Sequence, residues 1–111
     1  MEDKRFICKE DTPEFLAIGH FTHDVTEHGL ILGGAAAYSS LAALKLGIET
    51  AIVTSVGTDF LHYERFKDIS VTLVDSNYKE TTTYLNIYNE GKRTQFIKGI
   101  SATINPEHVP T

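Results

Sequence analysis

Two adjacent glycines, Gly33 and Gly34, come directly before an alanine-rich segment of helical composition. Glycine lets a ligand approach the backbone closely, and the first N–H groups of a helix have no partner within the helix. Such N–H groups can donate to the oxygens of a bound molecule. The other interpretation is a tight turn that needs only a positive φ angle. The pair by itself leaves both interpretations open.

Asp24 lies in a polar stretch, residues 20–28, that follows the first short apolar run. We interpret this stretch as a loop after a strand, and ligands of open α/β sheets bind at the carboxyl ends of the strands. A carboxylate there can accept hydrogen bonds from two hydroxyls of a sugar without taking a proton. The alternative is a solvated loop acid. The binding hypothesis gains weight because Asp24 and the glycine pair are expected at the same edge of the sheet.

The same stretch offers imidazole groups beside the carboxylate, and zinc or a non-haem metal accepts both as ligands. The spacing argues against a metal site, because it is not the i, i+4 pair of a helix. His20 and His23 also have opposite parity, so they would point to opposite faces of a strand. We therefore predict hydrogen-bonded or surface histidines, and no metal site, for His20, His23 and His28 with Asp24.

The segments around these candidates predict an α/β fold. Residues 15–19 form a short apolar run typical of a buried strand, and residues 30–32 form a second run before the glycine pair. Residues 35–46 place Ala and Leu at helical spacing, with Gly47 as a stop, and residues 50–56 predict another core strand. The connections are long enough for right-handed crossovers, so we expect a parallel sheet.

The remainder of the chain is richer in β-formers. Thr58 is placed to cap a helix over residues 59–67, and residues 71–74 favour a strand. Residues 81–98 predict a β-hairpin, because β-branched and aromatic residues flank a turn that contains glycine. Residues 105–107, Asn-Pro-Glu, are typical of the opening of a helix, for which few residues remain before Thr111.

Composition limits the functional classes. The chain has 111 residues and a formal net charge of −5, which argues against a nucleic-acid or anionic-membrane partner. A single cysteine, Cys8, cannot form an internal disulfide and gives no reason for an oxidising compartment. The N-terminus shows no apolar core of a signal peptide, and no apolar run approaches the ~18 residues of a membrane span. We expect one small cytoplasmic domain.

Three segments, taken in order, resemble the N-terminal part of the ribokinase-like, or PfkB, carbohydrate kinase family. G-H-F-T-H-D at 19–24 is similar to the first strand and its substrate-binding aspartate. G-G-A-A-A-Y-S-S-L-A-A-L-K-L-G at 33–47 resembles the glycine-pair signature with its helix, and V-G-T-D-F at 56–60 resembles the segment after the next strand. The β-rich stretch that follows has the position of the substrate lid of the family.

The resemblance implies a partial parallel-sheet core, approximately residues 13–68 and 99–111, and a small β-sheet lid, approximately residues 69–98. It implies an ATP- and Mg²⁺-dependent transfer of a γ-phosphoryl group to a hydroxyl of a sugar, polyol or nucleoside. On this reading Asp24 binds substrate hydroxyls, and Gly33 and Gly34 form the wall beside the substrate. The lid strands of such kinases often pair between subunits, so a homodimer through the lid is expected.

Tyr38 marks a first departure from the family pattern. It stands where the family usually has a sugar-contacting asparagine. A tyrosine can still donate and accept a hydrogen bond, but it is larger. Tyr38 is therefore a candidate substrate contact with altered specificity.

The catalytic segment of the family is a second departure. The Gly-Ala-Gly-Asp segment that supplies the catalytic base and anion hole of such kinases does not occur in this chain. The resemblance places that base downstream of Thr111, so no residue of this chain is assigned as catalytic. We therefore expect little or no kinase activity from this chain alone. The alternative function is non-catalytic polyol binding, or association through the β-ribbon.

Overall fold

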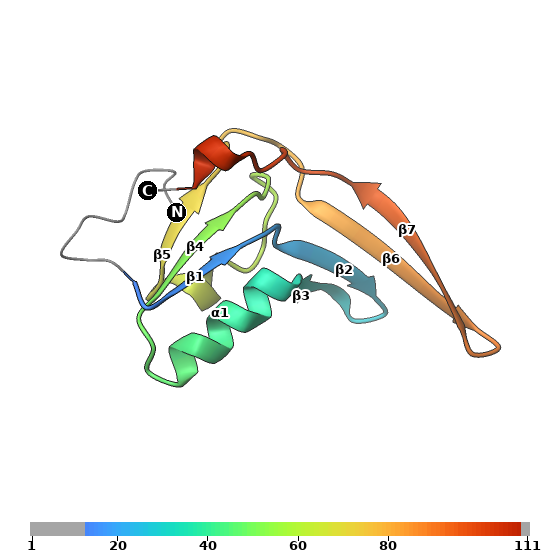
Figure 1. The fold of residues 1–111 in the computed structure, drawn as a ribbon. Coiled ribbons are helices and arrows are strands. Elements are labelled where there is room, and N and C mark those ends of the chain that lie inside the picture. The colour runs from blue at the N-terminus through green and yellow to red at the C-terminus, as the bar shows by residue number, and fades with distance from the viewer. Residues whose placement is uncertain (1–12, 110–111) are drawn as a thin grey trace.

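The computed structural model describes residues 13–109. Cys8 and Thr111 lie outside the described residues, and with them the expectations about a disulfide and about a catalytic base beyond Thr111. The described residues form two β-sheets, one α-helix and two short 3-10 helices (Figure 1). The strands are β1 Phe15–Ile18, β2 Thr22–Thr26, β3 Gly29–Gly33, β4 Thr50–Thr54, β5 Ser70–Leu73, β6 Thr82–Asn89 and β7 Lys92–Gly99. The helices are α1 Ala35–Lys45, η2 Tyr63–Phe66 and η3 Pro106–His108.

The first sheet has three parallel strands in the order β1-β4-β5. Every residue of the central strand β4 is buried, as expected for a parallel sheet that is covered on both faces. Helix α1 packs against β1 and β4 and places small side chains on the sheet, which lets the helix approach closely. Its buried residues are Ala36, Ala37, Ser40 and Ala43. The predictions of a parallel sheet and of this helix are confirmed.

Local signals in the sequence fix both ends of α1. Gly34 precedes the helix with a φ of 105°, and Gly47 follows it with a φ of 80°. The N–H of Gly47 donates to the carbonyl of Leu44 at 2.9 Å, which closes the last turn. Near the end of the described chain, Asn105 takes the N-cap position of η3 as its sequence predicts, although η3 makes only a single turn. The N–H of Asn105 donates to Nδ1 of His108 at 2.8 Å.

The interpretation of residues 20–28 as a loop is wrong, because Thr22–Thr26 form strand β2. This strand pairs with β3 on one side and with β6 on the other, in a second sheet of order β3-β2-β6-β7. The polar side chains of β2 suit a strand of which only one end is buried. The hydrogen bonds that make it a strand come partly from β6, about sixty residues later in the chain. A local pattern cannot show that partner.

Two further expectations about the middle of the chain are also wrong. The helix predicted over residues 59–67 is reduced to η2, because Asp59 binds the start of β6 and Phe60 turns into the core. The strand near residues 71–74, which the resemblance assigned to the lid, is β5 and pairs with β4 in the parallel sheet. Its alternate residues Val71 and Leu73 are both buried against the core.

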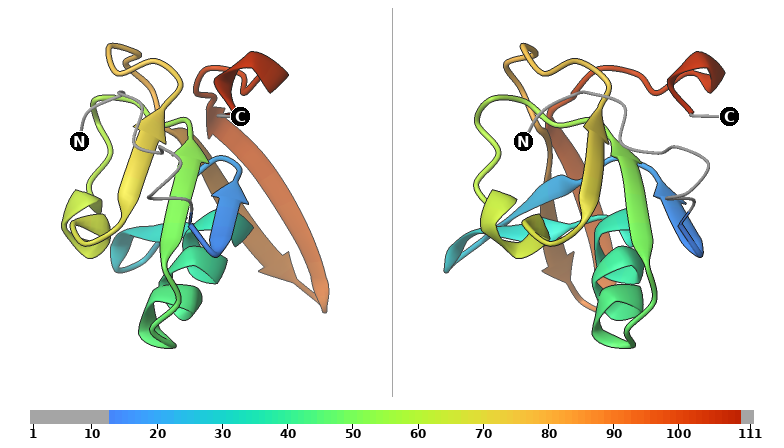
Figure 2. Two further views of the ribbon diagram at one scale, coloured as in Figure 1. Left: turned by 60° about the vertical axis from the view of Figure 1, so that its left-hand side comes forward. Right: turned by 90° about the vertical axis from the view of Figure 1, so that its left-hand side faces the viewer.

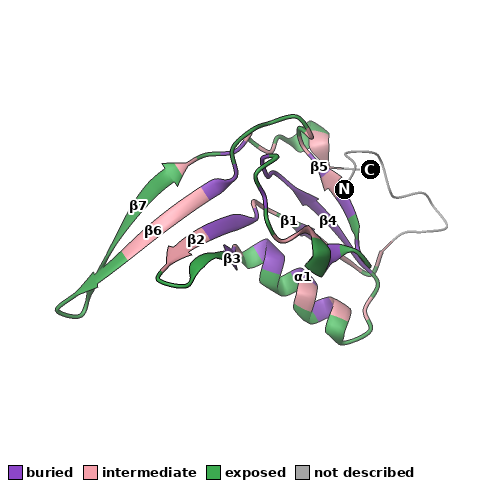
Figure 3. Cartoon of the chain, turned by 180° about the vertical axis from the view of Figure 1, so that it is seen from behind, coloured by how far each residue is buried: buried purple, intermediate pink, exposed green. Residues whose placement is uncertain are grey.

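The hydrophobic core lies between the three-stranded sheet, α1 and the segment around η2. Phe21 stacks on Phe66 with ring centroids 4.5 Å apart, and both side chains are fully buried together with Ile52. The hairpin of β6 and β7, predicted from residues 81–98, extends away from this core (Figure 2). Burial falls along the hairpin toward its tip, as Figure 3 shows. No helix in residues 13–109 is long and apolar enough to cross a membrane.

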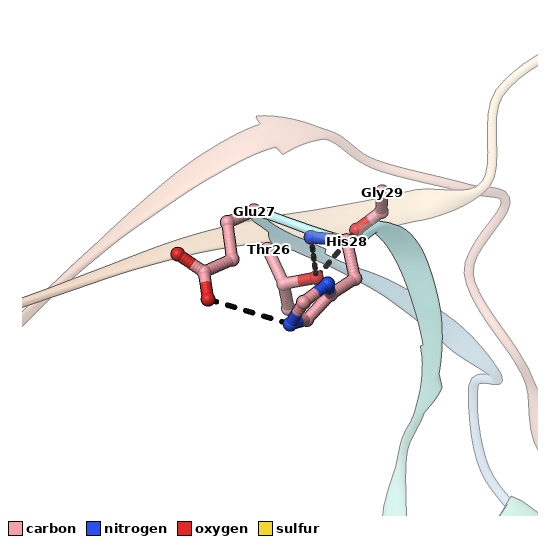
Figure 4. A network of polar contacts seen from close by, with 4 residues as sticks. All are labelled: Thr26, Glu27, His28 and Gly29. Carbon is pink, nitrogen blue, oxygen red and sulfur yellow. Dashed lines mark hydrogen bonds and ion pairs between the residues drawn. The ribbon is translucent and has the colours of Figure 1, made fainter.

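The turn between β2 and β3 is held by a local network of polar contacts (Figure 4). The hydroxyl of Thr26 donates to the carbonyl of Gly29 at 2.9 Å and accepts from the N–H of His28 at 3.0 Å. His28 also lies 3.3 Å from the carboxylate of Glu27, with both side chains largely exposed. Exposed ion pairs contribute little, so the Thr26 hydroxyl is the main constraint on this turn.

Candidate functional site

The pairing register of the four-stranded sheet places Asp24 in the middle of one face. Asp24 lies opposite Ile31 of β3 and Tyr84 of β6, and Tyr84 lies opposite Ile97 of β7. Opposite residues of paired strands share a face, since side chains alternate along each strand. This face, which we call the Asp24 face, therefore presents a carboxylate between one aliphatic and one aromatic side chain. The expected position of Asp24 beside the glycine pair is correct, whereas no local sequence signal indicates Tyr84 as its neighbour.

Gly33 lies directly under the Asp24 carboxylate. A Cβ atom at position 33 would lie 2.8 and 2.9 Å from the two carboxylate oxygens of Asp24, and closer still to the Thr22 hydroxyl. Real Cβ atoms do not approach oxygen this closely, so any side chain at position 33 would push the carboxylate away. The expected meeting of Asp24 with the glycine pair is therefore confirmed, and Gly33 leaves the space that Asp24 occupies.

Gly34 carries the backbone from β3 into α1. Besides its positive φ, it packs so closely on the link between β1 and β2 that a Cβ would lie 2.6 Å from the carbonyl oxygen of His20. Both observations require glycine at position 34. The turn interpretation of the glycine pair is thus correct for Gly34, while the nearby N–H groups at the start of α1 have no side-chain cap.

Tyr38 projects from the first turn of α1 back toward β3. Its hydroxyl donates a hydrogen bond to the carbonyl of Leu32, and about half of the side chain is exposed. The hydroxyl is therefore already paired within the protein. Tyr38 still lies one turn after the glycine pair, and its half-exposed side chain stays a candidate contact for a molecule bound there.

A pocket of about 230 Å³ opens on the Asp24 face, next to Tyr84. Its lining consists of His20, Thr82, Tyr84, Ile97 and Ile100. His20 comes from the link between β1 and β2, and its Nε2 lies 2.9 Å from the carbonyl of Ala102. That contact joins residues 82 positions apart in the chain. No local pattern in the sequence indicates this pocket, because its lining comes from segments far apart in the chain.

The structure separates the histidines that were considered as metal ligands. His20 pairs with a backbone carbonyl, His23 is buried in the core, and His28 lies at the exposed β2–β3 turn. Within residues 13–109, no group of three or more His, Cys, Asp or Glu side chains could hold a metal ion.

His23 is a core side chain on the face of β2 opposite Asp24. Its ring stacks on Phe60 with centroids 5.4 Å apart, and its Nε2 accepts the N–H of Leu61 at 3.2 Å. Burial lowers the pKa of His23 below its ordinary value of 6.5, and His62 lowers it further, while Asp59 and Asp24 act in the opposite direction. The neutral ring thus fits both its surroundings and its role as an acceptor.

This buried histidine predicts a pH-dependent stability. Because the pKa is lower in the folded than in the unfolded chain, the unfolded chain binds more protons below about pH 6.5. The stability that the neutral His23 ring contributes is fully present above that pH, and we expect the free energy of unfolding to fall as the pH is lowered from 7.5 to 5.5. Urea denaturation at several pH values measures this free energy. One proton limits the slope to about 1.4 kcal/mol per pH unit.

His23→Gln keeps an acceptor for Leu61 but cannot titrate, so this variant should show a shallower pH dependence than the parent chain. His28→Gln is the matched control, because His28 is exposed and its removal should leave the slope intact. An unchanged slope in His23→Gln would show that another group titrates.

A second network, which sequence analysis missed, joins the two sheets at the base of β6. The Asp59 carboxylate accepts hydrogen bonds from the N–H and the hydroxyl of Thr81, at 2.9 and 2.6 Å. The Thr81 hydroxyl in turn accepts the N–H of Gly57 at 2.9 Å. These hydrogen bonds of the V-G-T-D-F segment link the loop after β4 to the residue before β6. They thereby set the position of the hairpin, and of Tyr84 on it, relative to the core.

This combination of a parallel sheet with a separate small sheet defines part of a ribokinase-like α/β fold. A pyrophosphate-dependent kinase in the ribokinase family has the same fold with a TM-score of 0.65 and 17% sequence identity, over 85% of this chain. Fructokinase from Xylella fastidiosa matches 86% of this chain with a TM-score of 0.64 and 18% sequence identity. The nucleoside kinase of Methanocaldococcus jannaschii, an archaeal member of the ribokinase family, matches 77% of this chain with a TM-score of 0.58 and 22% sequence identity.

This chain covers 36% of the length of each of these three structures. No protein-family model matches the chain, and no curated protein matches it in sequence. The resemblance to ribokinase-like kinases that the sequence motifs predicted is therefore confirmed at the level of the fold.

Proposed function

We propose that this chain is the acceptor-binding and lid portion of a small-molecule kinase. In this proposal the Asp24 face holds a sugar, polyol or nucleoside, one hydroxyl of which receives a phosphoryl group. The four-stranded sheet serves as the lid, and the chain works in the cytoplasm. The observation that carries the proposal is the Asp24 carboxylate, held over Gly33 on a sheet face that also has a pocket.

The chemistry of Asp24 suits an acceptor alcohol. The carboxylate is half-buried, so it is shielded from bulk water without being sealed off. Hydrogen bonds to an ionised group are stronger than those between neutral groups, and one carboxylate can accept from two neighbouring hydroxyls. Asp24 thereby orients the acceptor and does not act as the base. Gly33 and Gly34 form the adjoining wall, and Tyr38 supplies its outer edge.

The donor in this proposal is ATP with Mg²⁺, as the motif resemblance implies. Similar structures include kinases that depend on pyrophosphate, one of which binds myo-inositol. Pyrophosphate is therefore the second donor to test. A homodimer through the lid also belongs to the proposal, because β7 is an edge strand with an exposed backbone and exposed side chains. The mass of the protein in solution, measured by light scattering, tests the proposed homodimer, for which we expect twice the mass of one chain.

Asp24→Asn tests the binding role. Asparagine keeps the shape of the side chain but loses its charge and exchanges one acceptor for a donor. We expect the affinity for a bound acceptor to fall about 10- to 100-fold. The measurement is titration of the 111-residue chain with ribose, fructose, myo-inositol and adenosine, followed by amide chemical shifts, which report even millimolar binding.

Asp68→Asn is the matched control, because Asp68 is exposed in the turn before β5 and outside the Asp24 face. It should bind acceptors like the parent chain. Equal affinities of Asp24→Asn and the parent for every acceptor would contradict the proposal. Saturable binding that depends on Asp24, without phosphate transfer from ATP or pyrophosphate in the native product that contains this chain, would favour the non-catalytic alternative.

A further inference from the structure

The pocket beside Asp24 has walls of a particular kind. Ile97 and Ile100 supply aliphatic surface and Tyr84 supplies an aromatic ring, whereas Thr82 is almost fully buried and already bonded to Ser101. Such a lining attracts a ring with apolar faces, since aromatic and aliphatic surfaces pack closely on it. It offers little to the many hydroxyls of a hexose or an inositol, which would lose their water on entering.

His20 adds one directed polar group to these walls. Its Nε2 lies 2.9 Å from the carbonyl of Ala102, and a carbonyl can only accept, so Nε2 carries the proton. In the neutral ring Nδ1 is then an acceptor, and it has no partner among residues 13–109. Because His20 lines the pocket, its imidazole adds to these apolar walls a group that can exchange a hydrogen bond with a ligand. A heterocycle that carries a ring N–H or an amino group has that pattern.

The size and position of the pocket indicate that it holds only part of a ligand. Its volume of about 230 Å³ is below the ~300–1,000 Å³ of sites that take a whole drug-sized molecule. Tyr84 lies opposite Asp24 on the neighbouring strand, and paired strands are about 4.8 Å apart. A ligand with a heterocycle in the pocket would thus place an attached group over the Asp24 carboxylate.

From this juxtaposition, and resting on the proposed function, we propose that the acceptor is a nucleoside. The base packs on Tyr84 and Ile97 in the pocket, with an N–H group donating to His20. The ribose lies over Gly33, where its two adjacent hydroxyls donate to Asp24. Ribose alone or a polyol satisfies only Asp24, so the pocket supplies the preference for the nucleoside.

The test compares adenosine, guanosine, cytidine and uridine with ribose and myo-inositol, by titration of the 111-residue chain followed by amide chemical shifts. We expect at least one nucleoside to bind about tenfold or more tightly than ribose, and the amides around Tyr84 and Ile97 to shift. Ile97→Ser should remove that advantage and leave ribose binding unchanged. Ile87→Ser is the matched control, because Ile87 is a similarly exposed isoleucine on the opposite face of the same hairpin.

The outcomes separate this inference from the proposed function. A nucleoside preference that is lost in Ile97→Ser and kept in Ile87→Ser supports it. Equal binding of ribose and nucleosides, weakened alike by Asp24→Asn, overturns the inference and leaves the proposed function standing. Nucleoside binding that Asp24→Asn does not weaken, or no binding of any acceptor by a folded chain, overturns both.

Discussion

Replacing Gly34 by alanine is expected to lower the free energy of unfolding by about 4 kcal/mol, enough to unfold much of a marginally stable chain. Two costs add at this position. A side chain at a φ of 105° is strained, and the new Cβ would lie 2.6 Å from the carbonyl oxygen of His20. That oxygen belongs to the backbone between β1 and β2, so it cannot swing aside as a side-chain tip could. Urea denaturation followed by circular dichroism measures the loss.

Gly29→Ala is the matched control for this prediction. Gly29 has nearly the same φ, 102°, but no atom lies within 4 Å of the position that its Cβ would take. We expect it to cost only the backbone strain, about 1–2 kcal/mol. The difference between the two variants measures the clash alone. Equal losses would show that the His20 backbone moves at no cost, and would remove the argument that position 34 requires glycine for close packing.

Replacing Gly57 by alanine is expected to separate the hairpin from the core and to cost about 2–4 kcal/mol. The backbone at Gly57 is not in the left-handed region, so strain plays no part. The cost arises because the new Cβ would overlap the backbone of Glu80, directly before β6. Moving that backbone away also breaks the bonds that link Gly57, Thr81 and Asp59.

Gly99→Ala provides the graded control, since it lies beside the same segment. Its Cβ would lie 3.2 Å from the Thr81 carbonyl oxygen, a contact that a shift of a few tenths of an ångström relieves. We expect a loss of stability below about 1 kcal/mol. Amide hydrogen exchange should show faster exchange at the start of β6 in Gly57→Ala but not in Gly99→Ala. Unchanged amide protection at the start of β6 in Gly57→Ala would contradict the proposal that the loop after β4 holds the hairpin on the core.

The sequence alone was sufficient for the elements whose signals are local. The Ala- and Leu-rich segment between Gly34 and Gly47 folds as α1, because both its composition and its flanking glycines act within one or two turns. The β6–β7 hairpin follows equally from β-branched residues around a glycine turn. The parallel sheet followed from element order, and the three motifs taken together led to the correct fold family.

Only the tertiary structure decided the placements that depend on distant partners. Asp24 is on a strand because β2 pairs with β6, and β5 joins the core because β4 is its neighbour. Asp59 does not begin the expected helix, because its carboxylate accepts a hydrogen bond from Thr81, 22 positions away. The pocket beside Asp24 is lined by residues from distant segments, and one of them, His20, is held by the carbonyl of Ala102. Local periodicity records which face of a segment is apolar, whereas pairing across the chain depends on which surfaces fit together once the core has formed.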